Sequence, residues 1–164
     1  MVKKLGVVFA AVLFVMAVTG VATAIAVEFG TAAEAKAMLE KAVTAVKADK
    51  AKALEMFTKG EGGFKDRDLY PFCGGPDGIF TAHPKLVGKS LKDLMDKAKP
   101  PKALGEEMYK VAKEGKISEV GYMWPRPGSE TPVQKVSFVT KVSDQVCAVG
   151  YYKEAASASG AGGY

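Results

Sequence analysis

One short segment, residues 66–91, constrains the fold of this chain more than any other part of it. The segment reads DRDLYPFCGGPDGIFTAHPKLVGKSL. Its apolar runs Leu69–Cys73 and Ile79–His83 are separated by the Pro-Asp-Gly sequence at 76–78. These three residues favour a tight turn, because proline fixes φ, aspartate can bond its own backbone and glycine tolerates positive φ. The sequence therefore predicts two strands joined as a hairpin, with Pro84 ending the second strand.

Helices are expected before and after this hairpin. Residues 32–58 carry apolar side chains at three- and four-residue steps, and Thr31 and Glu34 have the spacing of a capping box, so one long helix or two consecutive helices should form there. Two shorter helices are expected, one near residues 90–98 with Ser90 as a possible N-cap and one from Leu104 to Ala112.

The rest of the chain alternates apolar and polar residues, as strands do. Three strands are predicted around residues 120–124, 136–140 and 146–152. A loop containing Pro127 and Gly128 separates the first two, which favours an antiparallel meander. The order of these elements predicts an α+β fold, in which the long N-terminal helix packs across a five-stranded antiparallel sheet.

The N-terminus has the layout of an export signal. A basic stretch, Met1–Lys4, precedes the apolar run Leu5–Val18, and Ala22-Thr23-Ala24 has the A-x-A form that signal peptidase accepts. We predict that residues 1–24 are a signal peptide and that the protein is periplasmic or secreted. The alternative is an uncleaved anchor, residues 5–27, that holds the domain on the outer face of the inner membrane. Residues 154–164 are expected to be a flexible tail.

Composition and charge narrow the class of function. A chain of 164 residues fits one domain. Its formal net charge of +5 falls to +3 if residues 1–24, with Lys3 and Lys4, are cleaved, and this charge is too small to argue for nucleic-acid binding. The lysines of the predicted N-terminal helix are typical of a solvated surface. We therefore expect no nucleic-acid partner.

The two cysteines, Cys73 and Cys147, both lie in predicted strands. Neither belongs to a C-x-x-C or C-x-x-C-H motif, so the sequence indicates no zinc ribbon and no covalently attached haem. In an oxidising compartment such a pair is most simply a disulfide. The alternative is two separate thiols that pack as small apolar groups.

Four side chains are candidates for a small-molecule site because they combine apolar surface with a polar atom. His83, the only histidine, stands where the second hairpin strand ends, and imidazole can donate, accept or bind metal near neutral pH. Tyr70, Tyr122 and Trp124 suit the edge of a wet cavity better than Phe72, which is expected to be core. Structural roles are the alternative for each of them.

Two cations flank the loop at residues 127–131. The guanidinium of Arg126 could pair with a carboxylate at two points, and the ammonium of Lys135 could act as a point charge, so either could select an acidic ligand. The alternative for both is a surface charge.

The sequence does not favour an enzyme. No serine stands in a G-x-S-x-G context and the single histidine is the only good base near pH 7, so we predict no catalytic residues. Apart from His83, only the cysteines have the softness of transition-metal ligands, and a disulfide would remove them. We therefore predict no metal and no other cofactor. A metal or redox protein using Cys73, Cys147 and His83 is kept as a third hypothesis.

A series of short motifs, in this order and spacing, resembles the core signature of single Cache domains, the extracytoplasmic ligand-sensing relatives of PAS domains. The motifs are Asp68-Leu69-Tyr70, Asp77-Gly78, Ala82-His83-Pro84, LVGKSL at 86–91, Asp93-Leu94, Tyr122-x-Trp124-Pro125-x-Pro127, Lys135 and Gly150-Tyr151. The likeness covers residues 31–153. Residues 97–102, KAKPPK, depart from it, because a glycine-containing turn is usual in the family at this point.

The resemblance implies a PAS-like sheet in which the first and last strands are neighbours, which supports the disulfide. It also implies a pocket built from Tyr70, His83, Trp124 and Lys135. A protein similar to Cache domains is expected to be a free-standing exported sensor, which binds a small metabolite, such as a carboxylate, and presents it to a membrane signalling or transport partner. The alternative is an exported accessory or structural protein with the same fold and no ligand.

Overall fold

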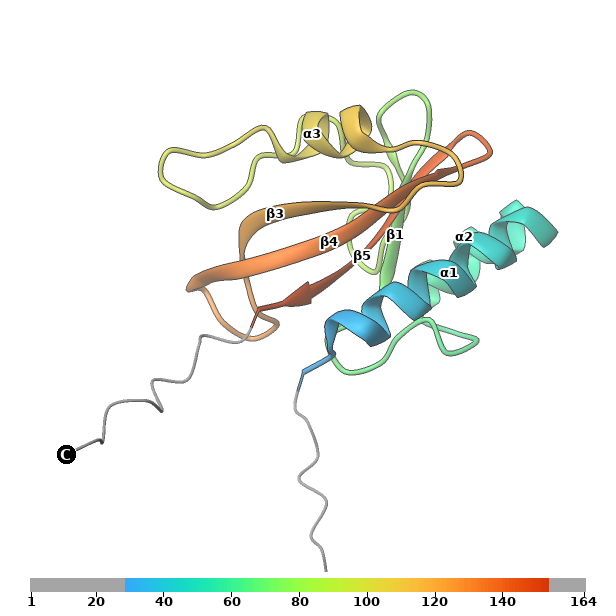
Figure 1. Ribbon diagram of the computed structural model, residues 1–164, viewed down its shortest axis with the longest axis horizontal. Coiled ribbons are helices and arrows are strands. Elements are labelled where there is room, and N and C mark those ends of the chain that lie inside the picture. The colour runs from blue at the N-terminus through green and yellow to red at the C-terminus, as the bar shows by residue number, and fades with distance from the viewer. Residues whose placement is uncertain (1–28, 154–164) are drawn as a thin grey trace, which may run out of the picture.

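Five antiparallel strands form the centre of the fold in the computed structural model, which describes residues 29–153 (Figure 1). The strands are β1 (Pro71–Gly74), β2 (Phe80–Ala82), β3 (Ser118–Pro125), β4 (Pro132–Val142) and β5 (Gln145–Tyr152). They lie in the order β2-β1-β5-β4-β3, and each neighbouring pair is antiparallel. The predicted α+β class, with a five-stranded antiparallel sheet, is confirmed.

Two consecutive helices, α1 (Ala32–Ala48) and α2 (Lys50–Lys59), cover one face of the sheet (Figure 1). The predicted capping box is present, since the Thr31 hydroxyl accepts from the backbone N–H of Glu34 and the Glu34 carboxylate accepts from that of Thr31. Asp49 separates the helices by leaving helical φ/ψ, and its carboxylate then caps α2. The two-helix alternative is therefore correct.

The hairpin that joins β1 and β2 forms as predicted. Gly78 adopts a φ of +83°, which a residue with a Cβ rarely tolerates, and the Asp77 carboxylate accepts from the backbone N–H of Ile79 at 3.1 Å. Cys73 pairs with Ala82 across the two strands. The tight turn thus fixes which side chains of the hairpin face each side of the sheet.

The segment after β2 contains no helix, so the short helix predicted near residues 90–98 is wrong. The Ser90 hydroxyl does accept from the backbone N–H of Asp93, as an N-cap would. The turn does not continue into a helix, because the backbone N–H of Asp96 bonds the Lys102 carbonyl and that of Lys97 bonds the Met123 carbonyl. Tertiary hydrogen bonds have replaced the helical ones.

The other face of the sheet is covered by this irregular segment and by α3 (Leu104–Val111), which forms where a helix was predicted (Figure 1). Leu104 and Met108 of α3 are buried in a second apolar cluster together with Val120 of β3 and Val139 of β4. The first cluster, on the α1 and α2 side, includes Leu39 and residues of β4 and β5. The sheet is therefore buried on both faces.

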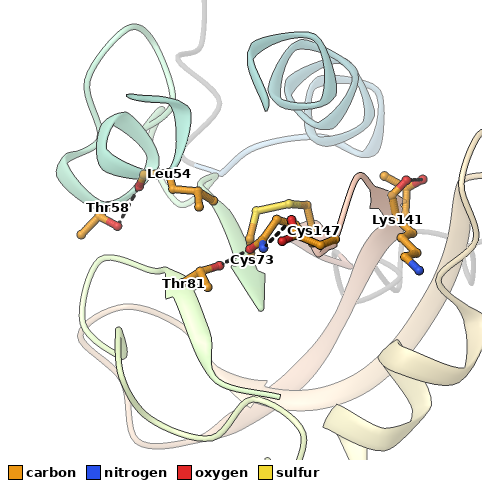
Figure 2. The surroundings of a disulfide bond; sticks show 9 residues. Leu54, Thr58, Cys73, Thr81, Lys141 and Cys147 are labelled. Atoms are coloured by element: carbon orange, nitrogen blue, oxygen red, sulfur yellow. Dashed lines mark hydrogen bonds between the residues drawn. A yellow bond between two sulfur atoms is a disulfide. The ribbon is translucent and has the colours of Figure 1, made fainter. Parts of the chain in front are cut away.

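Cys73 of β1 and Cys147 of β5 lie directly opposite each other and are joined by a disulfide (Figure 2). Both are completely buried, in the cluster on the side of α1 and α2. The predicted bridge is thus present, and the first and last strands are neighbours, as the resemblance implied. The alternative of two separate thiols is wrong.

Residues 29–153 include no helix that is long and apolar enough to cross a membrane. The predicted signal peptide at 1–24, the alternative anchor at 5–27 and the tail at 154–164 lie outside the described residues. They stay predictions.

Candidate functional site

A cavity opens between the sheet and the segment that runs from the end of β2 through α3. It lies on the face opposite α1 and α2 and holds about 330 Å³ of empty space, counting its open mouth. Its enclosed part is only about 30 Å³, far below the volume of a typical small-molecule site, so a ligand would require the walls to move apart. Its walls are formed by Tyr70, Phe72, Phe80, His83, Leu86, Leu94, Leu104, Met108, Tyr122, Trp124 and Lys135.

Five of the six predicted ligand-binding residues line this one cavity. They are Tyr70, His83, Tyr122, Trp124 and Lys135. They come from four places: the residue before β1, the end of β2, β3 and β4. The sheet register explains part of this, because Lys135 is the cross-strand partner of Tyr122, and Trp124 follows Tyr122 on the same face.

Arg126 does not line the cavity. Its guanidinium carbon lies 3.8 Å from the centre of the Phe29 ring and 5.0 Å from that of Tyr152, so it packs against the segment that leads into α1. Its Nη1 atom is buried and makes no hydrogen bond within residues 29–153. The sequence could not indicate this position, because Phe29 is nearly a hundred residues away along the chain.

Lys135 is the charged group of the cavity, and its side chain is buried, with 3% exposed. Its ammonium lies 5.1 Å from the centre of the Tyr70 ring and 4.6 Å from that of Tyr152. No acceptor within the described residues forms a hydrogen bond with it. Burial lowers the pKa of Lys135 to about 8, while the nearby charge of Asp68 acts in the opposite direction. Near pH 7 the cavity therefore contains a positive charge that no protein acceptor among residues 29–153 bonds.

His83 adds a neutral donor. Its Nδ1 atom accepts from the backbone N–H of Lys85 at 2.9 Å, so the neutral ring carries its proton on Nε2. Burial, with the charges of Lys135 and Lys85, lowers the pKa of His83 to about 4. The ring packs edge-on against Phe80 and Tyr70. One ring nitrogen therefore bonds the backbone, and the second nitrogen, Nε2, is left for a ligand.

Tyr122 and Trp124 form the wall on β3. The Tyr122 hydroxyl and the Ser137 hydroxyl are 2.9 Å apart and hydrogen-bonded, and burial raises the pKa of Tyr122. The two aromatic rings meet edge to face at 6.2 Å. The ammonium of Lys97, from the segment opposite, lies 5.6 Å from the Trp124 ring centre. Trp124 is therefore in contact with both walls.

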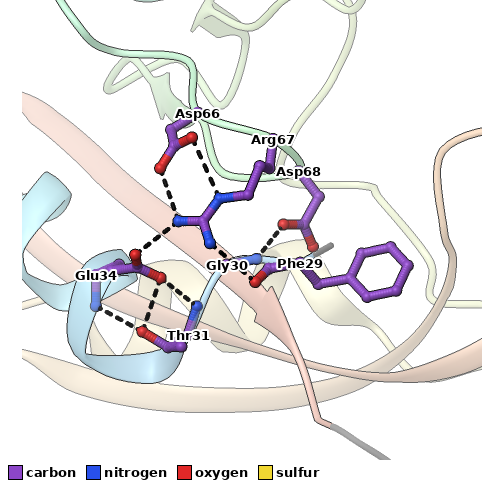
Figure 3. Close-up of polar contacts among 7 residues, drawn as sticks. All are labelled: Phe29, Gly30, Thr31, Glu34, Asp66, Arg67 and Asp68. Atoms are coloured by element: carbon purple, nitrogen blue, oxygen red, sulfur yellow. Dashed lines mark hydrogen bonds and ion pairs between the residues drawn. The ribbon is translucent and has the colours of Figure 1, made fainter. Parts of the chain in front are cut away.

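A buried carboxylate stands behind the cavity. Asp68 accepts a 2.6 Å hydrogen bond from the backbone N–H of Gly30, and its other oxygen is buried without a hydrogen bond inside the described residues. Figure 3 shows this carboxylate beside the backbone of Phe29 and Gly30. The neighbouring Arg67 donates to the Phe29 carbonyl and pairs with Glu34. The chain leading into α1 is thus fixed to the segment that also carries Tyr70.

Most of the apolar residues that line the cavity were not predicted from the sequence. Phe72 was expected to be core, and it is both core and cavity wall. Leu86 and Leu94 stand within the motifs that carried the resemblance, which was the available signal for them. Leu104 and Met108 have the spacing of any buried helix face, so nothing in the sequence distinguished a wall from a core.

The metal hypothesis lacks a ligand set in the part of the chain that the structure describes. Residues 29–153 contain no group of three His, Cys, Asp or Glu side chains that could hold an ion. Cys73 and Cys147 are bonded to each other and so cannot act as thiolates.

Comparison with known proteins decides the family. A family model described as Cache domain matches residues 31–155. The chain belongs to the Cache domain family. None of the curated proteins matches this Cache domain in sequence.

Solved structures resemble this Cache domain over most of its length. One is a methyl-accepting chemotaxis protein from Vibrio parahaemolyticus RIMD 2210633, with 25% identity, a TM-score of 0.58 and coverage of 73% of this chain and 86% of that one. Another is the periplasmic sensor domain of a chemotaxis protein, with 25% identity, a TM-score of 0.56 and coverage of 74% and 90%.

A third similar structure is a Cache chemosensory domain that was solved for the structural basis of its carboxylic acid recognition. It shares 21% identity with a TM-score of 0.53, and the match covers 74% of this chain and 88% of that one. At this identity the likeness concerns the fold. This Cache domain is therefore similar to the sensor domains of chemotaxis proteins.

Proposed function

We propose that this Cache domain binds a small carboxylate reversibly outside the cytoplasm and presents the result to a membrane signalling or transport partner. The observation that carries the proposal is Lys135, whose side chain is largely buried in the cavity wall and whose ammonium makes no hydrogen bond within the described residues. A largely buried charge is costly, and a ligand carboxylate would supply both the opposite charge and the acceptors.

The other walls limit what else the ligand carries. His83 offers one further donor, the Nε2–H of a neutral imidazole, which can bond a carboxylate oxygen or a hydroxyl. The remaining walls are largely apolar, including Phe72, Leu86 and Met108. A small acid with a short apolar part fits these walls better than a molecule with several charges. The neighbouring solved structure of a domain that recognises carboxylic acid is consistent with this class.

The signal would be a shift in population between two arrangements of residues 84–101. Leu86 and Leu94 bring this segment into the cavity wall, so a ligand that contacts them can favour one arrangement over another. We propose binding without catalysis, in a domain that spans residues 31–153 and is exported by a signal peptide at 1–24. The similar chemotaxis structures, one of them a periplasmic sensor domain, support that location.

A thermal-shift screen of the exported protein against organic acids, amino acids and amines tests this function. A ligand present at a hundred times its Kd should add about 2.7 kcal/mol to the free energy of unfolding. Carboxylates should give the shifts and amines should not. The Lys135→Met variant should lose the shift, because methionine keeps the length of the side chain and removes its charge.

Lys141→Met is the matched control, since Lys141 lies on the same strand β4 with its side chain exposed. It should bind the same acid as well as wild type. A screen in which only amines stabilise the protein, or an acid that Lys135→Met binds normally, would contradict the carboxylate proposal. A folded protein that no compound stabilises would favour the accessory role without a ligand.

A further inference from the structure

The segment from residue 84 to residue 102 presents an unusual outer surface beside the cavity. Among the described residues, the two large apolar side chains that are exposed are Val87, at 50%, and Met95, at 46%. Both belong to this segment. Each directly follows a leucine of the cavity wall, Leu86 or Leu94, so both lie close to the same cavity.

The charge of this surface is strongly positive. Residues 84–102 hold six lysines and two aspartates. The lysines are all exposed, and within the described residues none of them takes part in an ion pair. They are Lys85, Lys89, Lys92, Lys97, Lys99 and Lys102. We call these lysines, with Val87 and Met95, the basic loop surface.

Only one of the two aspartates offsets this charge outside the molecule. Asp96 is buried, and its carboxylate accepts from the backbone N–H groups of Ala98, Lys102 and Met123. Asp93 is exposed and accepts from the Ser90 hydroxyl, so one negative charge stands against the six lysines. Other exposed carboxylates lie at Asp77 of the hairpin turn and at Glu106 and Glu107 in the first turn of α3.

The backbone of the segment is held in place although it has no regular structure. The backbone N–H of Phe80 donates to the Lys89 carbonyl, that of Lys97 to Met123, and that of Gly105 to Leu94. In Figure 1 the part just before α3 is the yellow loop that runs out beside that helix, well away from the start of α1. Little ordering of the backbone would be required for this surface to dock.

We propose that the basic loop surface docks the domain on an anionic lipid bilayer. Lysine ammonium groups act as point charges and suit a diffuse layer of anionic headgroups, whereas specific pairing with carboxylates of a protein favours arginine. The exposed Val87 and Met95 can enter the headgroup region, which adds apolar burial to the electrostatic attraction. Two isolated apolar side chains fall short of the apolar centre of a stable protein interface.

Vesicle flotation of the full exported chain tests this inference directly. The probes are vesicles of phosphatidylglycerol mixed with an equal amount of phosphatidylcholine, and vesicles of phosphatidylcholine alone. The chain should bind the anionic vesicles more strongly, and high salt should remove the difference by screening. Replacing Lys89, Lys99 and Lys102 with glutamine should weaken this anionic binding by roughly tenfold or more.

The matched control replaces Lys36, Lys47 and Lys52 of α1 and α2 with glutamine, which removes the same charge from another exposed surface. It should bind nearly as wild type. A Glu106→Gln, Glu107→Gln double variant should bind the anionic vesicles more tightly than wild type. A Val87→Ser, Met95→Ser double variant should bind them more weakly than wild type at all salt concentrations. Circular dichroism spectra like that of wild type show that each variant folds.

Equal loss in both lysine variants would show a nonspecific effect of net charge and overturn the proposal. So would equal binding to neutral and anionic vesicles, or binding that the loop variant leaves unchanged. If the chain did not bind vesicles and residue 95 crosslinked to an acidic protein, the partner of this surface would be a protein and the bilayer proposal would be wrong. None of these outcomes depends on the carboxylate ligand, which the screen above tests separately.

Discussion

Lys135 on β4 is paired directly with Tyr152 on β5, and its ammonium lies 4.6 Å from the centre of the tyrosine ring. The Tyr152 hydroxyl donates to the Pro125 carbonyl at 2.6 Å, which holds that ring in position. Tyr70 presents a second ring at 5.1 Å. Aromatic faces attract a cation but cannot accept the hydrogen bonds that a carboxylate accepts. The sheet register thus places a charge where it is only partly compensated.

Lys135→Met should make the ligand-free protein more stable near pH 7. The pKa of Lys135 is about 8 in the folded protein, against an ordinary value of 10.5. The full cost of burying its charge is present below about pH 8, and it is lost as the pH rises towards 10.5, because the unfolded chain then binds more protons than the folded one. That cost is roughly 3 kcal/mol at most, and the aromatic contacts recover part of it.

Urea unfolding of wild type and Lys135→Met at several pH values measures this. The variant should exceed wild type by about 1 to 3 kcal/mol near pH 7, with the difference shrinking above pH 8. Lys141→Met should match wild type throughout. A Lys135→Met protein that is less stable than wild type at neutral pH would show that the aromatic contacts and the nearby charge of Asp68 outweigh the burial cost.

Gly150→Ala should damage the cavity without removing any charge. A Cβ at residue 150 would lie 2.6 Å from Cε of Lys135 and 2.7 Å from Oγ of Ser137, both closer than real contacts allow. The lysine is the flexible neighbour, so its ammonium should move. We expect about 1 to 3 kcal/mol of destabilisation from overpacking, with a loss of carboxylate affinity. Gly121→Ala is the control, because its Cβ would meet only one atom, at 3.9 Å. Titration calorimetry and thermal unfolding together would separate the two effects.

His83 should destabilise the protein in acid. Its pKa is about 4 in the folded protein and 6.5 ordinarily, so as the pH falls below about 6.5 the unfolded chain takes up the proton first and stability is lost. Because the ring is partly open to solvent, we expect roughly 1 to 2 kcal/mol of loss down to pH 4. His83→Gln should remove this component, which unfolding curves at pH 4.5 and 7 can measure. Identical pH profiles would show that the imidazole titrates normally.

The sequence predicted the parts of the fold that depend on local chemistry. Gly78 needs positive φ, Thr31 and Glu34 complete a capping box, and the alternation in β3 to β5 marks strands, so these elements could be predicted. The helix near residues 90–98 could not be rejected, because the N–H groups of Asp96 and Lys97 bond the carbonyls of Lys102 and Met123, which lie outside the expected helix. Long-range hydrogen bonds leave no mark on local periodicity.

The candidate site was predictable to a similar degree. The resemblance, which rests on the order of the motifs, predicted that Tyr70, His83, Trp124 and Lys135 share a pocket. Tyr122 follows from the alternation on β3. Arg126 has the same local context as a pocket residue. Its actual neighbour, Phe29, precedes the first helix, and no pattern in the sequence relates the two. Apolar walls such as Met108 look like ordinary core residues.

The mature chain should begin close to Ile25, since Ala22 and Ala24 occupy the positions that signal peptidase requires, with Ala26 as a second possible cleavage site. N-terminal sequencing of protein recovered from an exporting host measures this. Retention of Met1–Lys4 together with fractionation into the membrane would establish the anchor at residues 5–27 instead.

Removing the disulfide should lower stability while leaving the cavity almost unchanged. Cys73 and Cys147 are 74 residues apart in sequence, and closing a loop of this length is worth roughly 4 kcal/mol in the chain-entropy model. The bridge lies in the cluster beside α1 and α2 (Figure 2), whereas the cavity lies on the other face of the sheet. The Cys73→Ala, Cys147→Ala double variant should therefore unfold at lower denaturant and still show the carboxylate shift.

Two measurements check this prediction. The mass of the freshly isolated protein after alkylation should show no modified cysteine unless a reductant is added. Urea unfolding should then give the reduced protein and the double variant similar free energies of unfolding, both lower than that of the oxidised protein. Both lack the cross-link that restricts the unfolded chain. A double variant that is as stable as wild type would show the bridge to be dispensable. Loss of carboxylate binding in a folded double variant would show instead that the two faces of the sheet are coupled through β1 and β5.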